Sequence, residues 1–302
     1  MMFFKSKNIL FITSTRLGDA VLSTGILNYF IQQNSQAQFT IACGPVAAGL
    51  FEHMPQRKRT LVMEKRSYDR HWFDLWRACI GQPWDRIIDL RGSCISYLLW
   101  ARKRQMVRGG RFAEHRTHYL ARAFKLDMLP LPVVWTNPKD DQKALEYLPK
   151  DSYIAFAPTA NWDGKIWPAG NFINLAKQFL SINSKLQFAV FYGPGEKEYA
   201  MASPLLHADL PVIDVGGRFS LSEVTSLLQR CQGFIGNDSG LMHLSAAANV
   251  PTLGLFGPSR VIEYAPVGKK TRAVIAPGPE GEAPIAALTV EKVFQSCQGL
   301  FF

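Results

Sequence analysis

The chain alternates between short apolar runs and amphipathic stretches of helical length, most clearly in its second half. The apolar runs are rich in β-branched and aromatic residues and carry few charges, so they predict strands that are buried on both faces. Alternation of such strands with helices is typical of parallel sheets covered by helices on both sides. The predicted strands are residues 8–13, 38–43, 86–90, 106–108, 153–157, 186–192, 212–215, 233–236 and 252–256, and the predicted helices are residues 20–33, 169–180, 222–229 and 241–248.

A proline-rich stretch at residues 129–150 separates the two alternating halves. It carries four prolines with charged residues between them, a composition typical of a linker. A chain of 302 residues is long enough for two domains that each bury a core. We therefore expect an α/β protein with two doubly wound domains, residues 1–140 and residues 150–285, and a last helix in residues 286–302 that returns to the N-terminal domain.

Positive charge is concentrated in the first half of the chain. The formal net charge is +10, and residues 1–150 hold 23 basic and 12 acidic side chains, against 11 and 12 in the rest. Such asymmetry indicates that one half faces an anionic partner. Two basic stretches, residues 57–66 and 102–125, fit contact with substrate phosphates, with anionic lipid, or only with solvent. No recognisable nucleic-acid-binding module accompanies them, so we expect no nucleic-acid partner.

The cysteines and the apolar runs limit the cellular setting. Five cysteines are scattered without any CxxC spacing, which predicts no zinc site and suits a reducing compartment. No run of about 18 apolar residues is present, and Arg16 and Asp19 interrupt the apolar start of the chain. These features predict a soluble, cytoplasmic protein.

The first loop of interest, residues 13–19, follows the first predicted strand. It contains neither GxGxxG nor GxxxxGK[ST], so it is neither a dinucleotide-binding nor a phosphate-binding loop of those types. It holds Gly18 beside Asp19 at the mouth of the first helix. Asp19 is either the N-cap of that helix or a general base that would face the cleft between the two expected domains, and the two roles are compatible.

The second loop, residues 157–168, follows the first strand of the second half. Thr159, Asn161 and Lys165 offer a hydroxyl, an amide and a cation at the end of a strand, a set that suits a diphosphate. The plain alternative is a solvated loop whose lysine points to water. For Trp167 we expect a packing role.

The third loop is the most specific, because the predicted strand 233–236 turns directly into a helix through Asn237-Asp-Ser-Gly240. Free backbone N–H groups at the start of that helix form an anion site suited to phosphate. Asp238 would repel a phosphate, so we expect it to cap the helix or to accept a hydrogen bond from a ribose hydroxyl. His243 lies in the first turn, where it is either a structural residue or part of the same site.

The three segments form one pattern: Arg16-Leu-Gly-Asp19, then Lys165-Ile-Trp-Pro168, then Gly236-Asn-Asp-Ser-Gly-Leu-Met-His-Leu-Ser-Ala-Ala247 through Phe256-Gly-Pro258. In order and spacing this pattern resembles glycosyltransferase family 9, the heptosyltransferase-type enzymes of lipopolysaccharide core assembly. The resemblance implies a GT-B fold, in which two Rossmann-like, doubly wound domains face each other across a cleft. It implies an acceptor on the N-terminal domain and a nucleotide-sugar on the C-terminal domain.

The resemblance also implies roles for single residues. Asp19 would be the base that deprotonates the acceptor hydroxyl, and Lys165 with the amides of Ser239 and Gly240 would stabilise the departing diphosphate. From the resemblance and the loops together, we predict donor contacts by Thr159, Asn161, Lys165, Glu196, Glu198, Asp238, Ser239, Gly240, Met242 and His243. On the acceptor side we predict Arg16, Gly18, Arg102, Arg104, Arg108 and Arg111.

The function implied by the resemblance is inverting, metal-independent transfer of a sugar, a heptose from ADP-heptose, to a lipopolysaccharide-core or related anionic glycolipid. No cofactor is expected, and the partners would be the nucleotide-sugar donor, the lipid-linked saccharide acceptor and the inner face of the inner membrane. Two alternatives stay open. One is a nucleotide-sugar-binding protein without transfer activity, and the other is transfer of a different sugar to another cell-surface glycan.

Overall fold

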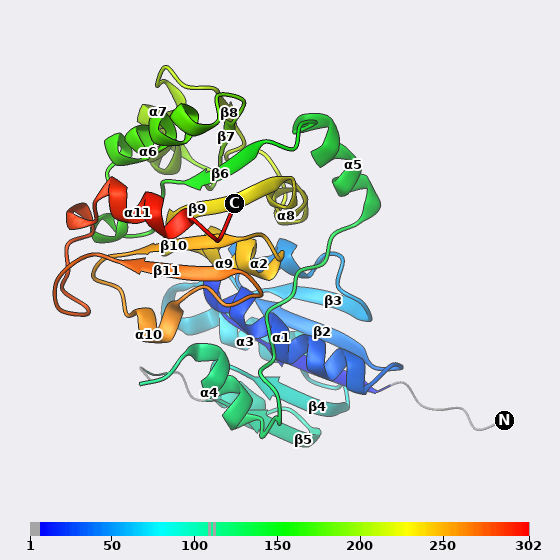
Figure 1. Ribbon diagram of the computed structural model, residues 1–302. Helices are drawn as coiled ribbons and strands as arrows, with labels where there is room; N and C mark the ends of the chain where they lie inside the picture. The colour runs from blue at the N-terminus through cyan, green and yellow to red at the C-terminus, as the bar shows by residue number, and fades with distance from the viewer. Residues whose placement is uncertain (1–6, 108–109, 111–112, 302) are drawn as a thin grey trace. The chain divides into compact units, whose positions relative to one another are not determined.

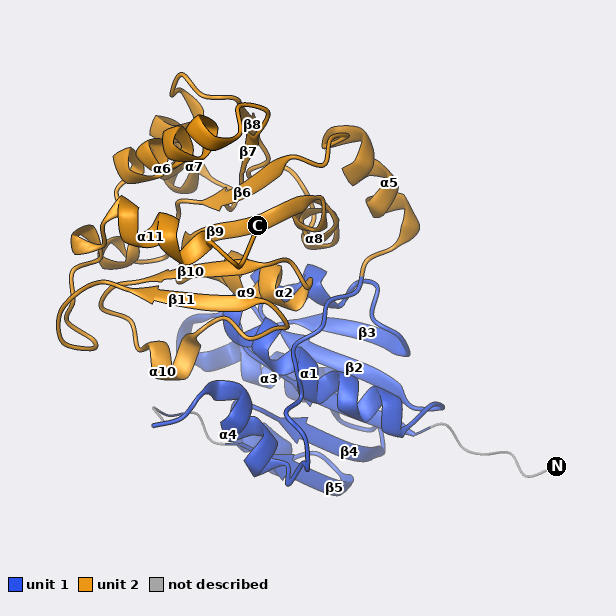
Figure 2. Ribbon diagram, in the orientation of Figure 1, with its two compact units in different colours: residues 1–135 blue, residues 136–302 orange. Residues whose placement is uncertain are grey.

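The computed structural model describes residues 7–107, 110 and 113–301, and the chain divides into two compact units. Unit 1 comprises Met1–Trp135 and unit 2 comprises Thr136–Phe302 (Figure 2). Each unit contains one parallel sheet with helices packed on it (Figure 1). The predicted α/β class with two doubly wound sheets is therefore confirmed.

Unit 1 contains a five-stranded sheet in the order β3-β2-β1-β4-β5. The longest helix of unit 1 is α1. Across both units, no helix in the described part of the chain has the length and apolarity needed to cross a bilayer. The elements are β1 (Asn8–Ile12), α1 (Leu17–Gln33), β2 (Gln38–Cys43), α2 (Pro45–Ala48), η1 (Gly49–Phe51), β3 (Arg57–Val62), η2 (Ser67–Asp69), α3 (Arg70–Cys79), β4 (Trp84–Asp89), η3 (Cys94–Tyr97), β5 (Ala101–Met106) and α4 (Arg116–Ala123).

The central strand of unit 1, β1, is buried on both of its faces. Leu10 and Ile12 of β1 are fully buried and pack in one cluster with Leu75 and Cys79 of α3. The intervening residues of β1 point to the opposite face, because successive side chains of a strand alternate. A strand buried on both faces must be apolar throughout, which is why the sequence reads as a continuous apolar run here.

Unit 2 contains a six-stranded sheet in the order β11-β10-β9-β6-β7-β8. The helices α6, α7 and α11 pack together, and so do α5, α8 and α9. The elements are α5 (Pro138–Tyr147), β6 (Tyr153–Ala157), η4 (Asp163–Lys165), α6 (Ala169–Ile182), β7 (Gln187–Val190), α7 (Glu196–Leu206), β8 (Val212–Asp214), α8 (Leu221–Gln229), β9 (Cys231–Asn237), α9 (Gly240–Ala247), β10 (Thr252–Phe256), α10 (Val261–Tyr264), β11 (Thr271–Ile275), η5 (Ile285–Ala287) and α11 (Val290–Cys297).

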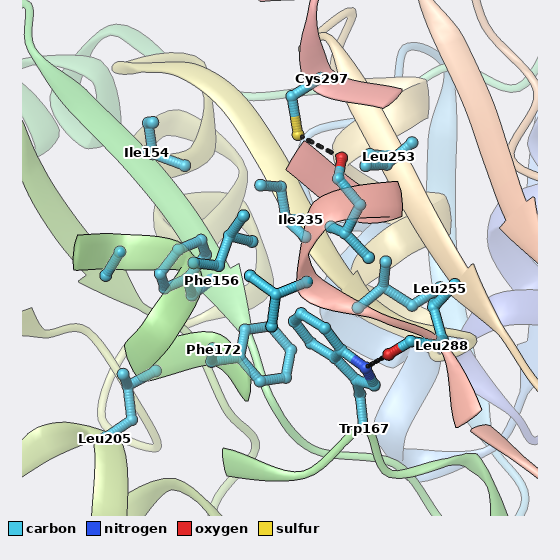
Figure 3. Close-up of a cluster of buried hydrophobic side chains, with 14 of the residues drawn as sticks. Ile154, Phe156, Trp167, Phe172, Leu205, Ile235, Leu253, Leu255, Leu288 and Cys297 are labelled. Carbon is cyan, nitrogen blue, oxygen red and sulfur yellow. Dashed lines mark hydrogen bonds between the residues drawn. The ribbon is translucent and has the colours of Figure 1, made fainter. Parts of the chain in front are cut away.

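An aromatic core lies between the sheet of unit 2 and helices α6 and α11 (Figure 3). Phe156 of β6 stacks on Phe188 of β7 with ring centroids 5.0 Å apart, and Phe172 of α6 meets Phe156 edge to face. Trp167 is fully buried in this core, and its indole Nε1 donates to the carbonyl oxygen of Leu288 at 2.8 Å. The packing role predicted for Trp167 is thus confirmed.

In each sheet the chain reverses the direction of strand addition once. In unit 1 it passes from β1 to β2 and β3, and then returns to place β4 on the other side of β1. In unit 2 it passes from β6 to β7 and β8, and then returns to place β9 on the other side of β6. We call these two places switch points. Doubly wound folds bind ligands in the crevice that opens there, outside the carboxyl ends of the strands.

The structure differs from the expected domain boundaries at both ends of unit 2. The stretch expected to be a linker contains α5, whose first turn is capped by Asn137 and which packs on α8, so the division falls at residue 135. The helix expected in residues 286–302 is α11, which packs on α6 and β11 of unit 2. Apolar contacts hold α11 in unit 2: Phe294 contacts the ring of Phe179, and Val293 and Cys297 are fully buried.

Two strands of unit 1 differ from expectation because they lie at the edges of the sheet. The strand predicted at 106–108 is wrong: β5 covers Ala101–Met106, and residue 108 lies outside the described part of the chain. β3 was not predicted at all. Both strands carry a run of three basic residues, since an edge strand with a solvated face tolerates charge, and lysine and arginine there discourage pairing with other chains. The two basic stretches, residues 57–66 and 102–125, therefore begin within the edge strands β3 and β5.

The close approach of α1 to the segment that leaves unit 1 gives a stability prediction. A Cβ atom at Gly25 would lie 2.1 Å from the backbone oxygen of Pro130, which cannot turn away. We expect Gly25→Ala to lower the free energy of unfolding by roughly 1–3 kcal/mol, although alanine favours helices. Gly170→Ala in α6, where a Cβ meets nothing within 4 Å, is the control, expected to be neutral or stabilising by up to about 1 kcal/mol. Urea denaturation measures both, and equal effects would contradict the close approach.

Candidate functional site

The switch point of unit 2 is built around the side chain of Asn237, the last residue of β9. Asn237 is fully buried, and its Nδ2 donates to the carbonyl oxygen of Pro158 at 2.8 Å. Its Oδ1 accepts from the backbone N–H of Trp167 at 3.1 Å. Both ends of the loop after β6 are therefore held to the end of β9, because a buried amide must satisfy its donor and its acceptor.

This loop places Lys165 against Asp238. Lys165 Nζ lies 2.5 Å from Asp238 Oδ2, with the lysine side chain 23% and the aspartate side chain 6% exposed. The N-cap residue of α9 is Ser239, so the expected capping role of Asp238 is wrong, and Asp238 instead holds the ammonium group in place. A contact of Asp238 with a ribose hydroxyl stays a prediction. An ammonium group has three donors, so Lys165 keeps the capacity to bind a second anionic group while it is paired.

The helix α9 begins directly beside this ion pair. Ser239 is its N-cap residue in extended conformation, but no side chain caps the helix, and the Ser239 hydroxyl has no hydrogen-bond partner among the described residues. The first backbone N–H groups of a helix have no partner within it, and the helix dipole is positive at this end. Lys165 thus lies beside the helix start at Ser239 and Gly240, and the anion site expected there stays a prediction.

The other predicted donor residues near α9 and β6 lie at different depths. Thr159 is buried in the loop after β6, whereas Asn161 is exposed in the same loop. His243 is buried in α9. Met242 is fully buried beneath β10, where its sulfur would be 2.4 Å from a Cβ at Gly254, so its side chain belongs to the core and offers no surface to a ligand.

The two glutamates predicted at the donor site lie in the first turn of α7. Glu196 is exposed, while Glu198 is half-buried and its Oε2 accepts from the backbone N–H of Gly193 at 3.2 Å. Glu198 therefore ties the start of the helix to the turn after β7. A donor contact by either glutamate stays a prediction.

Asp19 lies at the carboxyl end of β1, in the first turn of α1. The helix begins at Leu17 with Arg16 as N-cap residue, so the expected N-cap role of Asp19 is wrong, and the carboxylate interacts with the positive end of the helix from inside its first turn. Asp19 is half-buried, and its Oδ2 accepts from Ser14 Oγ at 3.5 Å. Arg16 is exposed and Gly18 half-buried, so both predicted acceptor-side residues flank Asp19.

The predicted acceptor-side arginines further along unit 1 lie elsewhere. Arg102, near the amino end of β5, pairs with Asp85 at 3.4 Å, and the guanidinium of Arg104 donates to the carbonyl oxygens of Ser96, Leu99 and Ala101. These contacts hold the turn before β5, so they give no support to a role at the carboxyl edge of the sheet. Arg108 and Arg111 lie outside the described residues.

A buried carboxylate at the end of β4 was missed in the sequence. Asp89 is fully buried, and it accepts from the backbone N–H groups of Arg91 and Ser93 and from the hydroxyls of Ser93 and Ser96. It thereby folds the loop after β4 over itself. The available signal was an acidic residue that ends an apolar strand and is followed by two serines.

The described residues also include side chains that could in principle bind a metal ion or react as thiols. No three His, Cys, Asp or Glu side chains gather there in an arrangement that would hold a metal ion. All five cysteines are free, and only Cys94 is exposed. Burial raises the pKa of Cys43 to about 12 and that of Cys79 to about 11, so neither is a thiolate near neutral pH.

The chain is similar in sequence to heptosyltransferases. The family model of glycosyltransferase family 9 (heptosyltransferase) matches residues 115–286. Lipooligosaccharide heptosyltransferase 2 of Haemophilus influenzae is 26% identical over 178 residues, which cover 52% of this chain and 50% of that protein. The chain spans about half the length of the first such curated relatives that it matches.

Solved structures are similar over nearly the whole chain. The glycosyl transferase family 9 protein of Veillonella parvula gives a TM-score of 0.83 at 19% identity, covering 99% of this chain and 98% of that one. The Escherichia coli ADP-heptose LPS heptosyltransferase II gives 0.78 at 22% identity, covering 97% and 98%. These likenesses confirm the expected GT-B class with two Rossmann-like units. Because the family model covers more than half of the chain, this protein belongs to glycosyltransferase family 9, the heptosyltransferase family.

Proposed function

We propose that this protein transfers a heptose from ADP-heptose to an anionic acceptor of the lipopolysaccharide-core type, with inversion at the sugar carbon and without a metal ion. The observation that carries the proposal is the ion pair of Lys165 and Asp238 beside the start of α9, at the switch point of unit 2. Family membership supports it, as does the fold shared with the E. coli ADP-heptose LPS heptosyltransferase II.

The donor half of the reaction needs a site that accepts growing negative charge. When the bond between the sugar carbon and the diphosphate oxygen breaks, both bonding electrons leave with the diphosphate. Lys165, oriented by Asp238, and the N–H groups at Ser239 and Gly240 would stabilise that charge from fixed positions, which costs no reorganisation during the reaction. The buried Thr159 in the same loop would contact the nucleotide.

The acceptor half needs a base at the carboxyl edge of unit 1. Asp19 would take the proton of the acceptor hydroxyl while the oxygen forms its bond to the sugar carbon on the face opposite to the diphosphate. That geometry inverts the configuration of the carbon. The half-buried carboxylate lies in the first turn of α1, and Ser14 Oγ donates to it at the long distance of 3.5 Å, which leaves lone pairs for the acceptor.

We also propose that the reaction takes place in the cytoplasm, at the inner face of the inner membrane. Large apolar side chains are exposed on η3, on the turn into β5 and on α3: Phe73, Tyr97, Leu98 and Trp100. Beside them is a cavity of about 570 Å³ with Trp72, Phe73, Trp76, Ile95 and Leu98 in its wall. Tyrosine and tryptophan side chains suit the headgroup level of a bilayer, because one end of each is apolar and the other is polar.

Removing the proposed base tests the mechanism. We expect Asp19→Asn to lower kcat between about 100-fold and 10,000-fold, the usual contribution of a general base, while ADP binding is unchanged. Release of ADP measures the rate in the presence of acceptor. Glu52→Gln, an exposed acid of unit 1, is the control and should retain full activity. Transfer that survives Asp19→Asn at the normal rate would remove Asp19 as the base.

Removing Lys165 tests the donor site. In thermal unfolding, we expect ADP at 100 times its dissociation constant to stabilise the protein by about 2.7 kcal/mol. Other nucleotides at the same concentration should stabilise it less. Lys165→Met should weaken ADP binding about tenfold or more, because a charge-assisted contact is lost. Lys177→Met, exposed on α6, is the control.

A double variant separates binding from stability at this position. Lys165→Met leaves the Asp238 carboxylate buried and unpaired, which is itself destabilising. Adding Asp238→Asn should restore the unfolding temperature but not the ADP affinity. Restored ADP affinity in the double variant would mean that Lys165 has only a structural role. If no nucleotide stabilises the unaltered protein, both the transferase proposal and the alternative of a nucleotide-sugar-binding protein without transfer activity are wrong.

Vesicle binding tests the membrane proposal. Sedimentation with anionic vesicles should exceed that with neutral ones and fall as salt is raised. Replacing Leu98 and Trp100, which are 66% and 61% exposed, by serine should weaken binding several-fold, since apolar contact area is lost. Ile182→Ser, at a 72% exposed position of unit 2, is the control. Equal binding to both vesicle types would mean that the basic stretches only face solvent.

A further inference from the structure

The cavity of about 570 Å³ beside α3 has walls from two segments that meet only in the folded unit. One wall is the side of α3 that carries Trp72, Phe73 and Trp76, and the other is the loop after β4 between Gly92 and Leu98. The rings of Phe73 and Trp76 contact each other with centroids 5.6 Å apart. The cavity therefore presents large apolar side chains, and its volume lies in the usual range for ligand pockets.

The polar groups of the loop wall are already paired within unit 1. Asp89 accepts hydrogen bonds from the backbone N–H of Ser93 and from the hydroxyls of Ser93 and Ser96. The backbone N–H groups of Ser96 and Leu98 donate to the carbonyl oxygens of Ser93 and Ile95. Because these donors are satisfied inside the loop, this wall offers an incoming molecule chiefly apolar contact.

Both walls are anchored in the core of unit 1, so the cavity is formed before a ligand enters. Ile95 is buried in the same cluster as Leu75, and the indoles of Trp72 and Trp76 pack against that cluster. The guanidinium carbon of Arg91 lies 4.9 Å from the centroid of the Trp72 ring and holds this indole from another side. A preformed cavity loses little conformational entropy when it binds a ligand.

Cations lie along the exposed side of α3 at this cavity. Arg70, Phe73 and Arg77 follow one another at spacings of three and four residues, so they share one stripe of the helix. Arg70 and Arg77 are exposed, and neither forms an ion pair within the described ranges of the chain. The carboxylate of Asp74 on the same helix is paired with Arg66. An apolar cavity with cations beside it is complementary to an apolar chain that ends in an anionic group.

We propose that this cavity holds one acyl chain of an anionic phospholipid, with the headgroup near Arg70 and Arg77. The proposal deepens, and rests on, the proposed location at the membrane: the protein would take up a single lipid chain besides resting apolar side chains on the bilayer. A hydrocarbon chain gains free energy from each CH₂ group that it buries. A peptide segment would bury backbone N–H and C=O groups against a wall whose own polar groups are paired, which is costly.

Cys94 provides a direct readout of the cavity. It lies in the wall and is the one exposed cysteine among the described residues, while the other four are buried. Alkylation of Cys94 by N-ethylmaleimide is followed while lysophosphatidylglycerol is added below its critical micelle concentration. We expect saturable protection by one lysolipid per protein, with an affinity that rises about tenfold for each two carbons added to the chain. The headgroup alone, glycerophosphoglycerol, should give no protection.

The headgroup assignment has its own comparison. Lysophosphatidylcholine with the same chain carries no net charge, so it should bind roughly threefold more weakly at low salt, and added salt should reduce the difference. Equal binding of the two lysolipids at low salt would overturn the anionic headgroup. Protection that is not saturable, or that does not depend on chain length, would overturn the chain site itself.

Matched variants show whether the effect is local. Leu98→Asp places a carboxylate in the wall at a 66% exposed position, and it should weaken the lysolipid dissociation constant about tenfold or more. Tyr97→Asp, at a 71% exposed position outside the wall, is the control and should leave binding unchanged. Should Leu98→Asp not fold, Phe73→Asp on the α3 wall, 60% exposed, carries the same expectation. Equal weakening by Tyr97→Asp contradicts a site in this cavity.

Vesicle binding separates this proposal from the proposed membrane location. Trp100→Ser, at a 61% exposed position outside the wall, should weaken vesicle binding but leave the protection of Cys94 unchanged. If anionic vesicles bind while no lysolipid protects Cys94, the cavity proposal alone is wrong. If lysolipid protects Cys94 and vesicles do not bind, the membrane location is wrong and the chain site stands. Neither result depends on sugar transfer.

Discussion

The pairing of strands that lie far apart in the sequence is the constraint on which both candidate sites depend. In unit 2, Ala157 of β6 lies opposite Gly236 of β9, and this register brings Lys165 to Asp238, 73 residues away. In unit 1, Ile12 of β1 lies opposite Asp89 of β4, which places the start of α1, with Asp19, and the loop after β4 at the same edge of the sheet. Without these two parallel pairings the loops of each unit would share no edge.

The two switch points use the same device to fix their loops. The strand that returns beside the first one ends in a fully buried polar residue, Asp89 in unit 1 and Asn237 in unit 2. Each of these side chains forms hydrogen bonds with atoms of the neighbouring loops. Asp89 folds its own loop, whereas Asn237 ties down the loop of its neighbour β6. A polar group that is costly to leave unpaired thus enforces a single loop conformation, which is what a binding site needs.

The fold could be read from the sequence where strands are buried on both faces, and failed at the edges. Runs such as Tyr153–Ala157 and Thr252–Phe256 have the same bounds in the structure as in the prediction, because only a doubly covered strand is apolar at every position. The strands β3 and β5 carry arginine and lysine and resemble solvated loops in sequence. The helix α5 was not predicted because the prolines of residues 129–150 are typical of a linker, although Pro138 stands in the first turn of this helix, where proline is tolerated.

The candidate site could be read from the sequence only in part. The anion-attracting start of α9 followed from the turn at Ser239 and Gly240, which is a local property. That Asp238 pairs with Lys165 was beyond reach, because it depends on the register of β6 against β9. The apolar cavity beside α3 was missed for a similar reason: its walls come from two separate segments, and neither of them carries a motif.

The long-range pairing of β6 and β9 also bears on how the chain acquires its structure during synthesis. Tyr153 must wait for Cys231, and β7 and β8 are made in between without the inner neighbour of β6. Pairings with a long intervening loop carry a larger closure entropy and form slowly. The first strands of unit 2 would therefore spend time on the ribosome with an open, apolar edge. Asp238, Ser239 and Gly240 follow directly after β9, so the segment that covers this edge also completes the proposed donor site around Lys165.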